Sequence, residues 1–156
     1  MRPPTAVPSI DMKHLFLTGA KGTGKSTRLR EITQNLPGTP TGFTTVRSDA
    51  AFSKMAVHLL KPGEKPTAEN FLFFCGENAD PARFDALGVA ALNIPGDYIL
   101  MDELGPAEAD AHVFQQAVLA ALEGDVPVYG VLQKADTPFL RQVAAHPKVE
   151  IVEMDT

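Results

Sequence analysis

The chain has 156 residues, 44% of them hydrophobic, which is enough for one α/β domain with a buried core and too few for two. Its formal net charge of −5 argues against a nucleic-acid partner, because proteins that bind nucleic acids rely on many Lys and Arg contacts to phosphates. The single cysteine, Cys75, excludes an intramolecular disulfide and a multi-cysteine zinc site, which suits a reducing cytoplasm.

Residues 1–12 are rich in proline and lack the apolar segment of a signal peptide. The sequence also has no apolar run of about 18 residues, the length needed to cross a bilayer. We therefore expect a flexible N-terminal tail over residues 1–12, a single domain over residues 13–156, a cytoplasmic location and no membrane partner.

Residues 13–27, KHLFLTGAKGTGKST, contain a short apolar run followed by the spacing G-x-x-x-x-G-K-[ST] of a phosphate-binding P-loop. Glycines allow the backbone angles that turn successive N–H groups into one concavity, and the helix behind the loop adds about half a positive charge. The predicted phosphate-binding residues are Gly19, Ala20, Lys21, Gly22, Thr23, Gly24, Lys25, Ser26 and Thr27.

Two residues at the end of this motif have further predicted roles. Lys25 has the length to reach the β- and γ-phosphate oxygens, and the Ser26 hydroxyl is a ligand for Mg²⁺. A strand, a loop and a helix start follow one another in the order that phosphate binding requires, which disfavours a glycine-rich turn without a ligand. We therefore expect residues 13–156 to form a P-loop domain that binds a nucleotide of the ATP or GTP class.

The first predicted helix runs over residues 25–36, where a Pro-Gly pair ends it. Alternating apolar and polar residues then predict two strands, 43–46 and 55–60, joined by a turn at residues 48–49. These strands are expected to form an antiparallel hairpin at one edge of the sheet. A further short strand is predicted at residues 71–75.

Asp80 followed by proline has the pattern of a helix N-cap and predicts a helix from Pro81 to about Leu92. The next apolar run, residues 98–101, predicts a strand covered on both faces, which ends in Asp102 and Glu103. With a P-loop upstream, two carboxylates at this place indicate a Walker-B site, and a solvated acidic strand end is the alternative. Asp102 would hold Mg²⁺ through its water shell, and Glu103 would polarise the attacking water.

A long helix is predicted over residues 106–123, followed by a buried strand at 126–132 that ends at Gln133. In P-loop proteins whose catalytic glutamate directly follows the Walker-B aspartate, this strand usually lies between the Walker-B strand and the P-loop strand. Gln133 is therefore a candidate nucleotide sensor, with a capping role as the alternative. A helix over 138–145 and a strand at 149–152 follow.

Strands that alternate with helices predict an α/β domain with the P-loop NTPase fold: a mostly parallel sheet between helices, with right-handed crossovers and the antiparallel hairpin at one edge. Ligands of such sheets bind at the carboxyl ends of the strands. Gly19, Asp102 and Gln133 are all predicted to lie there.

The combination of GAKGTGKST, GFTTVR, a strand ending in DELGPAE and a PVYGVL strand resembles the small P-loop nucleoside-triphosphatases known from thermophiles and also found in animals. The resemblance covers residues 15–152, and DELG with Glu108 three residues further on is similar to that family's DEIG-x-x-E signature. It implies Mg²⁺-dependent hydrolysis of nucleoside triphosphates with loose base selectivity, and it adds Glu108 to the acidic side of the site.

Two features depart from the family's pattern. The family's hairpin carries an acidic residue in T-x-E-V-R, whereas this chain reads TTVR over residues 44–47. The family's chains commonly continue past the last strand with an Asn-Arg pair, whereas this chain reads EMDT over residues 153–156.

Three other functions fit parts of the pattern. A GTPase is suggested by the D-x-x-G match at residues 102–105 and by QKAD at 133–136, which approximates N-K-x-D, but a G domain needs another strand and helix between these motifs. A small-molecule or nucleotide kinase would bind an acceptor near the hairpin and the loop at residues 61–70, although no arginine-rich lid is recognisable. A nucleotide-gated binding module would hydrolyse little.

An arginine that meets the γ-phosphate charge is worth about 10³ to 10⁵ in rate in related reactions. Arg47 in the hairpin and Arg141 after Gln133 are the candidates within this chain, each weighed against a solvated surface charge, and a partner protein is a further source. The four histidines lack metal-ligand spacing. The sequence as a whole predicts a nucleoside-triphosphatase in which Lys25 and Glu103 carry the catalysis.

Overall fold

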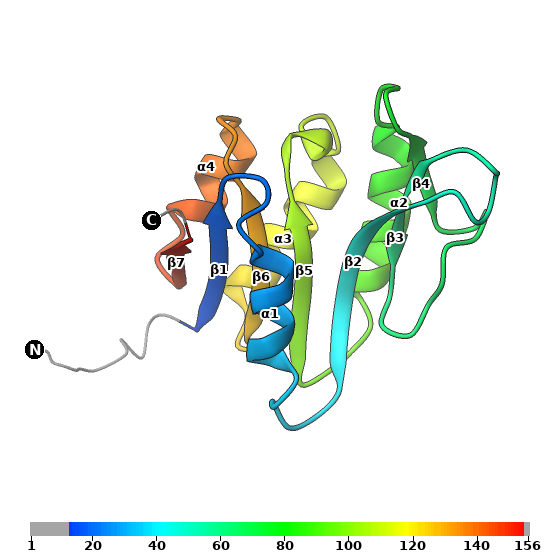
Figure 1. Cartoon of the computed structure of the whole chain (residues 1–156). Coiled ribbons are helices and arrows are strands. Elements are labelled where there is room, and N and C mark those ends of the chain that lie inside the picture. The colour runs from blue at the N-terminus through cyan, green and yellow to red at the C-terminus, as the bar shows by residue number, and fades with distance from the viewer. Residues whose placement is uncertain (1–12, 155–156) are drawn as a thin grey trace, which may run out of the picture.

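The computed structural model describes residues 13–154, and the tail predicted over residues 1–12 lies outside the described part, as do residues 155 and 156. Strands and helices alternate along the chain, as Figure 1 shows. The elements are β1 (His14–Gly19), α1 (Lys25–Thr33), β2 (Pro40–Ser48), β3 (Ala56–Leu60), β4 (Phe71–Phe74), α2 (Pro81–Leu92), β5 (Tyr98–Leu104), the 3₁₀ helix η1 (Pro106–Glu108), α3 (His112–Glu123), β6 (Val128–Gln133), α4 (Pro138–Ala144) and β7 (Val149–Glu153).

The strands form one sheet in the order β4-β3-β2-β5-β6-β1-β7. The strands from β2 to β7 in this order pair in parallel, whereas β3 pairs antiparallel with both β2 and β4. The predicted mostly parallel sheet is therefore confirmed. The predicted hairpin consists of β2 and β3, and β4 lies outside it as the edge strand.

Helices cover both faces of the sheet. In Figure 1, α1 lies in front of the sheet and α2, α3 and α4 lie behind it. The core under α1 is small and centres on Leu17, Leu29 and Val131. The core on the other face is larger, and its buried side chains come from the sheet and from all three helices behind it. The carboxyl ends of β1, β5 and β6 line a cavity beside the amino end of α1.

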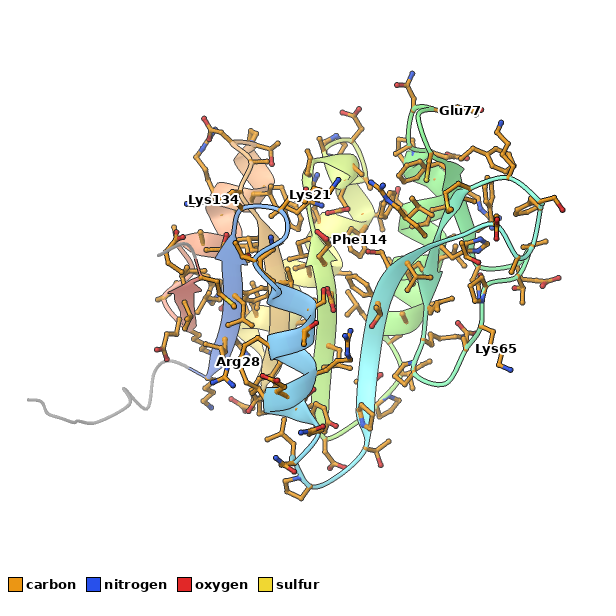
Figure 2. The ribbon with its side chains drawn as sticks, in the orientation of Figure 1. Lys21, Arg28, Lys65, Glu77, Phe114 and Lys134 are labelled. Carbon is orange, nitrogen blue, oxygen red and sulfur yellow. The ribbon has the colours of Figure 1, made fainter. Side chains whose placement is uncertain are left out.

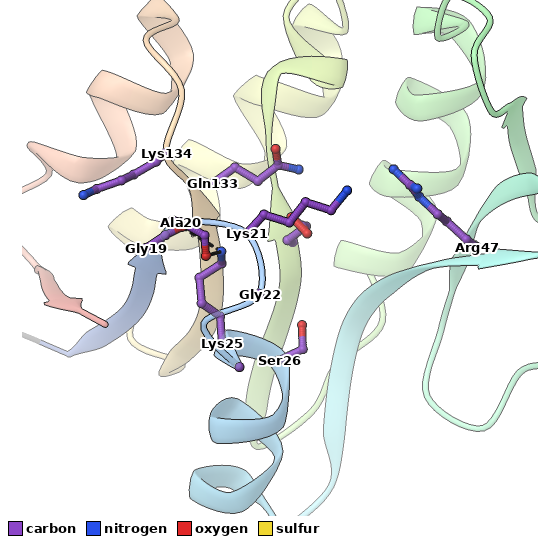
Figure 3. A pocket seen from close by; sticks show the side chains of 11 residues that line it. Gly19, Ala20, Lys21, Gly22, Lys25, Ser26, Arg47, Gln133 and Lys134 are labelled. Atoms are coloured by element: carbon purple, nitrogen blue, oxygen red, sulfur yellow. Dashed lines mark hydrogen bonds between the residues drawn. The ribbon is translucent and has the colours of Figure 1, made fainter. Parts of the chain in front are cut away.

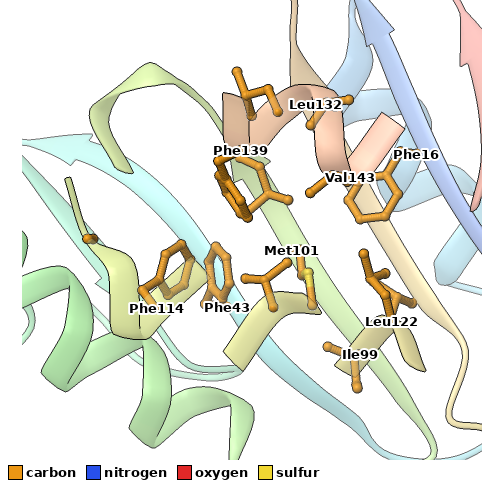
Figure 4. Close-up of a cluster of buried hydrophobic side chains, with 14 of the residues drawn as sticks. Phe16, Phe43, Ile99, Met101, Phe114, Leu122, Leu132, Phe139 and Val143 are labelled. Atoms are coloured by element: carbon orange, nitrogen blue, oxygen red, sulfur yellow. The ribbon is translucent and has the colours of Figure 1, made fainter. Parts of the chain in front are cut away.

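The larger core holds α2 and α3 close together. Figure 4 shows Phe43 and Phe114 side by side, with ring centroids 5.5 Å apart. A Cβ atom added to Gly88 of α2 would lie 2.1 Å from Phe114 Cδ1, so only glycine permits this approach. The backbone N–H of Phe114 donates to Asp85 Oδ1 at 2.8 Å, which satisfies a free N–H in the first turn of α3 with a carboxylate of α2.

The helix predicted over residues 106–123 is divided. It begins as η1, and α3 starts only at His112. The division is stabilised by side chains, because the Gln115 amide donates to the carbonyls of Glu108 at 2.7 Å and Ala109 at 3.0 Å. The predicted N-cap at Asp80 is confirmed, since Asp80 Oδ1 accepts from the N–H of Ala82 at 3.0 Å. Between residues 13 and 154, no helix has both the length and the apolar character to span a membrane.

Candidate nucleotide and catalytic site

The P-loop connects the end of β1 to the start of α1, at the carboxyl edge of the sheet (Figure 2). Gly22 and Gly24 have φ angles of 85° and 81°, in the left-handed region that favours glycine. An added Cβ would meet no other atom within 4 Å at either position, so backbone conformation alone demands glycine there. Gly24 serves as the N-cap residue of α1 and leads directly into Lys25.

The Lys25 ammonium lies across this loop. Its Nζ donates to the carbonyl oxygens of Gly19 at 2.7 Å and Ala20 at 3.0 Å. The Thr23 hydroxyl donates to the same Ala20 carbonyl at 2.8 Å. The positive charge is thereby held within the loop, beside the backbone that the motif assigns to phosphate binding.

Ser26 and Asp102 join the P-loop to the end of β5. The Ser26 hydroxyl donates to Asp102 Oδ1 at 2.9 Å, and Asp102 is only 6% exposed. Burial raises the pKa of the Asp102 carboxyl above its ordinary value, and the hydrogen bond from Ser26 opposes that rise. A hydroxyl and a carboxylate oxygen next to a phosphate-binding loop form a donor set suited to Mg²⁺, so these two residues fit the ion that the sequence predicts.

A cavity of about 470 Å³ extends from the P-loop to the ends of β5 and β6. Figure 3 shows Lys21, Lys25 and Ser26 on one side of it, Gln133 above and Arg47 opposite. The residues that line it are Gly19, Ala20, Lys21, Gly22, Gly24, Lys25, Ser26, Arg47, Glu103, Gln133 and Lys134. The structure thus brings together most of the predicted phosphate-binding residues with both Glu103 and Gln133.

Thr23, Thr27 and Asp102 do not line this cavity, although all three belong to the predicted site. Thr23 is turned to the Ala20 carbonyl, and the Thr27 hydroxyl accepts from Arg30 Nη2 at 3.3 Å on the exposed side of α1. Asp102 is buried behind Ser26. Thr23 and Asp102 therefore contact the residues that form the site, and Thr27 faces solvent.

An irregularity in β5 separates the two acidic residues. Asp102 pairs with Val131 of β6 and Leu104 pairs with Leu132, so the ladder passes over Glu103. Glu103 is partly exposed and lines the cavity, whereas Asp102 is buried. Adjacent carboxylates thus reach two different environments, one beside the P-loop serine and one in the open cavity.

Gly105 makes room for Gln133. A Cβ atom on Gly105 would lie 2.4 Å from Gln133 Nε2, so the amide occupies the space that any larger residue at 105 would fill. β6 lies between β5 and β1, the position that the sequence predicts for this strand. Lys134, which sequence reasoning did not select, also lines the cavity, and its position directly after Gln133 at the strand end was the available signal.

The two candidate arginines differ in their surroundings. Arg47 lines the cavity, and within residues 13–154 its guanidinium has no hydrogen bond or ion pair. Arg141 forms an exposed ion pair with Asp136 and lines a different cavity beside α4. Of these two arginines, Arg47 is therefore the one whose charge is directed at the predicted phosphate site.

A second cavity of about 270 Å³ adjoins the first on the side away from the P-loop. Glu108 lines it and is 4% exposed, and its Oε2 accepts from the N–H of Gly105 at 2.5 Å. Burial raises the pKa of Glu108 to about 8, although the bond from Gly105 opposes the rise. Glu108 is thus near Glu103, as the resemblance implied, but lies in this second cavity and not among the phosphate-binding groups.

Two solved structures are similar to this fold. One is THEP1 from the hyperthermophile Aquifex aeolicus, at a TM-score of 0.70 and 18% identity over 90% of this chain and 89% of that one. The other is a human cancer-related nucleoside triphosphatase, at a TM-score of 0.56 and 18% identity over 90% of this chain and 88% of that one. At this identity the likeness establishes the P-loop NTPase fold.

Sequence comparison identifies the family. No curated protein matches the sequence significantly. A family model described as NTPase matches residues 76–156, which is just over half of the chain and includes Asp102, Glu103 and Gln133. This chain therefore belongs to the NTPase family of P-loop proteins.

Proposed function

We propose that this protein is a Mg²⁺-dependent nucleoside-triphosphatase that converts a nucleoside triphosphate and water into the diphosphate and inorganic phosphate. The observation that carries the proposal is the 470 Å³ cavity, in which the P-loop, Glu103 and Gln133 face one another. The family match and the likeness to a human nucleoside triphosphatase support the same reaction. By resemblance to this family, base selectivity is loose and ATP is accepted.

The P-loop and Lys25 bind the nucleotide. The backbone N–H groups of residues 19–27 and the amino end of α1 attract the phosphate chain, and Lys25 exchanges the carbonyls of Gly19 and Ala20 for phosphate oxygens. Ser26 and Asp102 would hold Mg²⁺. When bound, this ion would neutralise the charge that develops on the phosphates during the reaction.

The residues on the side of the cavity opposite the P-loop carry out the hydrolysis. Glu103 orients the attacking water and takes its proton, because it is the carboxylate that lines the cavity. Gln133 contacts the terminal phosphate or the water, and the Arg47 guanidinium stabilises transition-state charge. Most of the catalysis is therefore electrostatic, by groups that the sheet holds in place.

The test is a panel of ATP, GTP, CTP and UTP, each incubated with the purified chain and Mg²⁺. Phosphate release from more than one of them is expected, together with loss of release when the Mg²⁺ is chelated. Tight binding of nucleotide without phosphate release would instead support a nucleotide-gated binding module. The same panel ranks the bases.

A further inference from the structure

The second cavity lies where a second substrate would meet the terminal phosphate. It shares Arg47, Glu103 and Gln133 with the nucleotide cavity, and no residue of the P-loop lines it. A molecule in it would therefore contact the groups assigned to turnover without contacting those assigned to phosphate binding.

The walls of this cavity combine an apolar side with a polar side. Val57 of β3, Phe73 of β4 and Phe84 of α2 line it, and the two phenylalanine rings lie 6.2 Å apart between centroids. Pro106 and Ala107 of η1 close it from another side. Its volume of about 270 Å³ corresponds to about nine water molecules and lies just below the usual range for drug-sized ligands. The shape and surface suit a small ring or branched chain.

The positive and negative charges that line the cavity cancel each other. Arg47 and Glu103 supply one positive and one negative charge, and Thr45 contributes a hydroxyl. Burial raises the pKa of Glu108 to about 8, so that its carboxyl is mainly protonated and neutral at pH 7. An ionised ligand would add an unpaired charge within partly apolar walls, which costs free energy. A neutral ligand with one hydroxyl group would not.

We propose that the second cavity binds a small neutral alcohol with an apolar body, and that this alcohol accepts the γ-phosphoryl group in place of water. The proposal rests on the proposed nucleotide chemistry of the first cavity. The alcohol oxygen forms a bond to the γ-phosphorus while the bond to the β–γ bridging oxygen breaks, and the diphosphate leaves with that electron pair. The hydroxyl proton passes to Glu103, and the products are a phosphate monoester and the nucleoside diphosphate.

The experiment compares ADP with inorganic phosphate. The full chain is incubated with ATP and Mg²⁺, with benzyl alcohol or cyclohexylmethanol as the probe. Hydrolysis alone gives the two products in equal amounts. With the alcohols, ADP is expected to exceed inorganic phosphate, and ³¹P NMR should show a phosphate monoester in the amount of that excess. Benzoate and benzylamine, which share the benzyl probe's ring but carry charge, should give no excess ADP.

Two variants fill the second cavity. Val57→Phe, and independently Ala107→Phe, should abolish the excess of ADP and leave phosphate release within about twofold. Val126→Phe makes the same kind of change at a half-exposed position that precedes β6 and should leave the excess unchanged. Thermal melting establishes that each variant is folded, and the Ala107 position is exposed, so the test does not depend on Val57→Phe alone.

Equal amounts of ADP and phosphate at every alcohol concentration would overturn this inference while leaving the proposed hydrolysis intact. An excess of ADP that both cavity-filling variants retain would overturn it as well, because the acceptor would then bind elsewhere. Failure to form either product, with or without alcohol, would overturn the proposed function together with the inference.

Discussion

The hydroxyl of Ser26 donates a hydrogen bond to Asp102 Oδ1 at 2.9 Å, which joins the first turn of α1 to the end of β5 across 76 residues of sequence. This contact links the P-loop directly to the acidic strand. It places the two proposed Mg²⁺ ligands together while Glu103 remains in the cavity.

Replacing the buried carboxylate should weaken the response to Mg²⁺. Asp102→Asn keeps the size of the side chain and a hydrogen-bond acceptor for Ser26 but removes the charge. The Mg²⁺ concentration for half-maximal phosphate release is expected to rise about 10- to 100-fold, the usual loss for residues around a metal. Asp110→Asn, at an exposed acidic position, is the control. An unchanged Mg²⁺ requirement would show that the ion is held elsewhere.

Two variants should separate binding from turnover. Lys25→Ala removes the ammonium that lies in the P-loop and should weaken binding of a fluorescent ATP analogue by at least about tenfold, since hydrogen bonds to charged groups contribute about 1.5–3 kcal/mol. Glu103→Gln should keep that binding and slow phosphate release by about 10² to 10⁴.

Glu77→Gln, which breaks only an exposed ion pair with Lys54, is the control for the glutamate. Phosphate release from Glu103→Gln at the rate of the unaltered protein would remove Glu103 from the mechanism.

The two arginines offer a matched comparison. Arg47→Ala should lower kcat with little change in KM, because the charge of Arg47 acts on the transition state. The loss in kcat approaches about 10³-fold if Arg47 acts like the arginines that stabilise the γ-phosphate charge in related enzymes. Arg141→Ala breaks only an exposed ion pair with Asp136 and should change kcat by less than about twofold. Equal effects of both substitutions on kcat would contradict the role of Arg47.

Glu108 should make the protein less stable as pH rises. Its pKa is raised from 4.5 to about 8 in the folded chain, so between these values the folded state keeps a proton that the unfolded state has released. The free energy of unfolding therefore falls as pH rises from about 4.5 to about 8 and then levels off. The charged groups that face Glu108 are Glu103 and, across the cavity, Arg47.

Glu108→Gln removes this titration and keeps an acceptor for Gly105. Compared with the unaltered protein, the variant should gain roughly 3 kcal/mol of stability between pH 5 and pH 8, since the shift covers most of this interval and each pKa unit corresponds to about 1.4 kcal/mol. Urea unfolding at the two pH values measures the difference. A parallel pH dependence in both proteins would show that Glu108 titrates normally.

The P-loop and the ends of β5 and β6 were predictable from sequence because each depends on a short local pattern. Glycine spacing defined the loop, and a continuous apolar run ending in carboxylates defined the end of β5. Their meeting in space followed from the rule that parallel strands end at one edge. Gln133 was reached by the same reasoning.

The second cavity could not be predicted in this way. Its walls come from Val57, Phe73, Phe84 and η1, which have no common motif and meet only through antiparallel pairing of β3 with β4 and packing of α2. The break between η1 and α3 escaped prediction for a similar reason. It depends on the Gln115 amide and on Asp85 of another helix, whereas the sequence of residues 106–123 alone favours a continuous helix.

Asp85 and Phe84 are neighbours on α2, and both contact Phe114 of α3. The Asp85 carboxylate accepts a hydrogen bond from the first turn of α3, while the Phe84 ring forms a wall of the second cavity. A change in the spacing of α2 and α3 would thus act on that wall directly, because the Phe84 ring packs against Phe114 with their centroids 5.8 Å apart. In the proposed acceptor reaction, selectivity among acceptors would consequently be adjustable from the interface between the two helices, by substitutions that never touch the bound molecule.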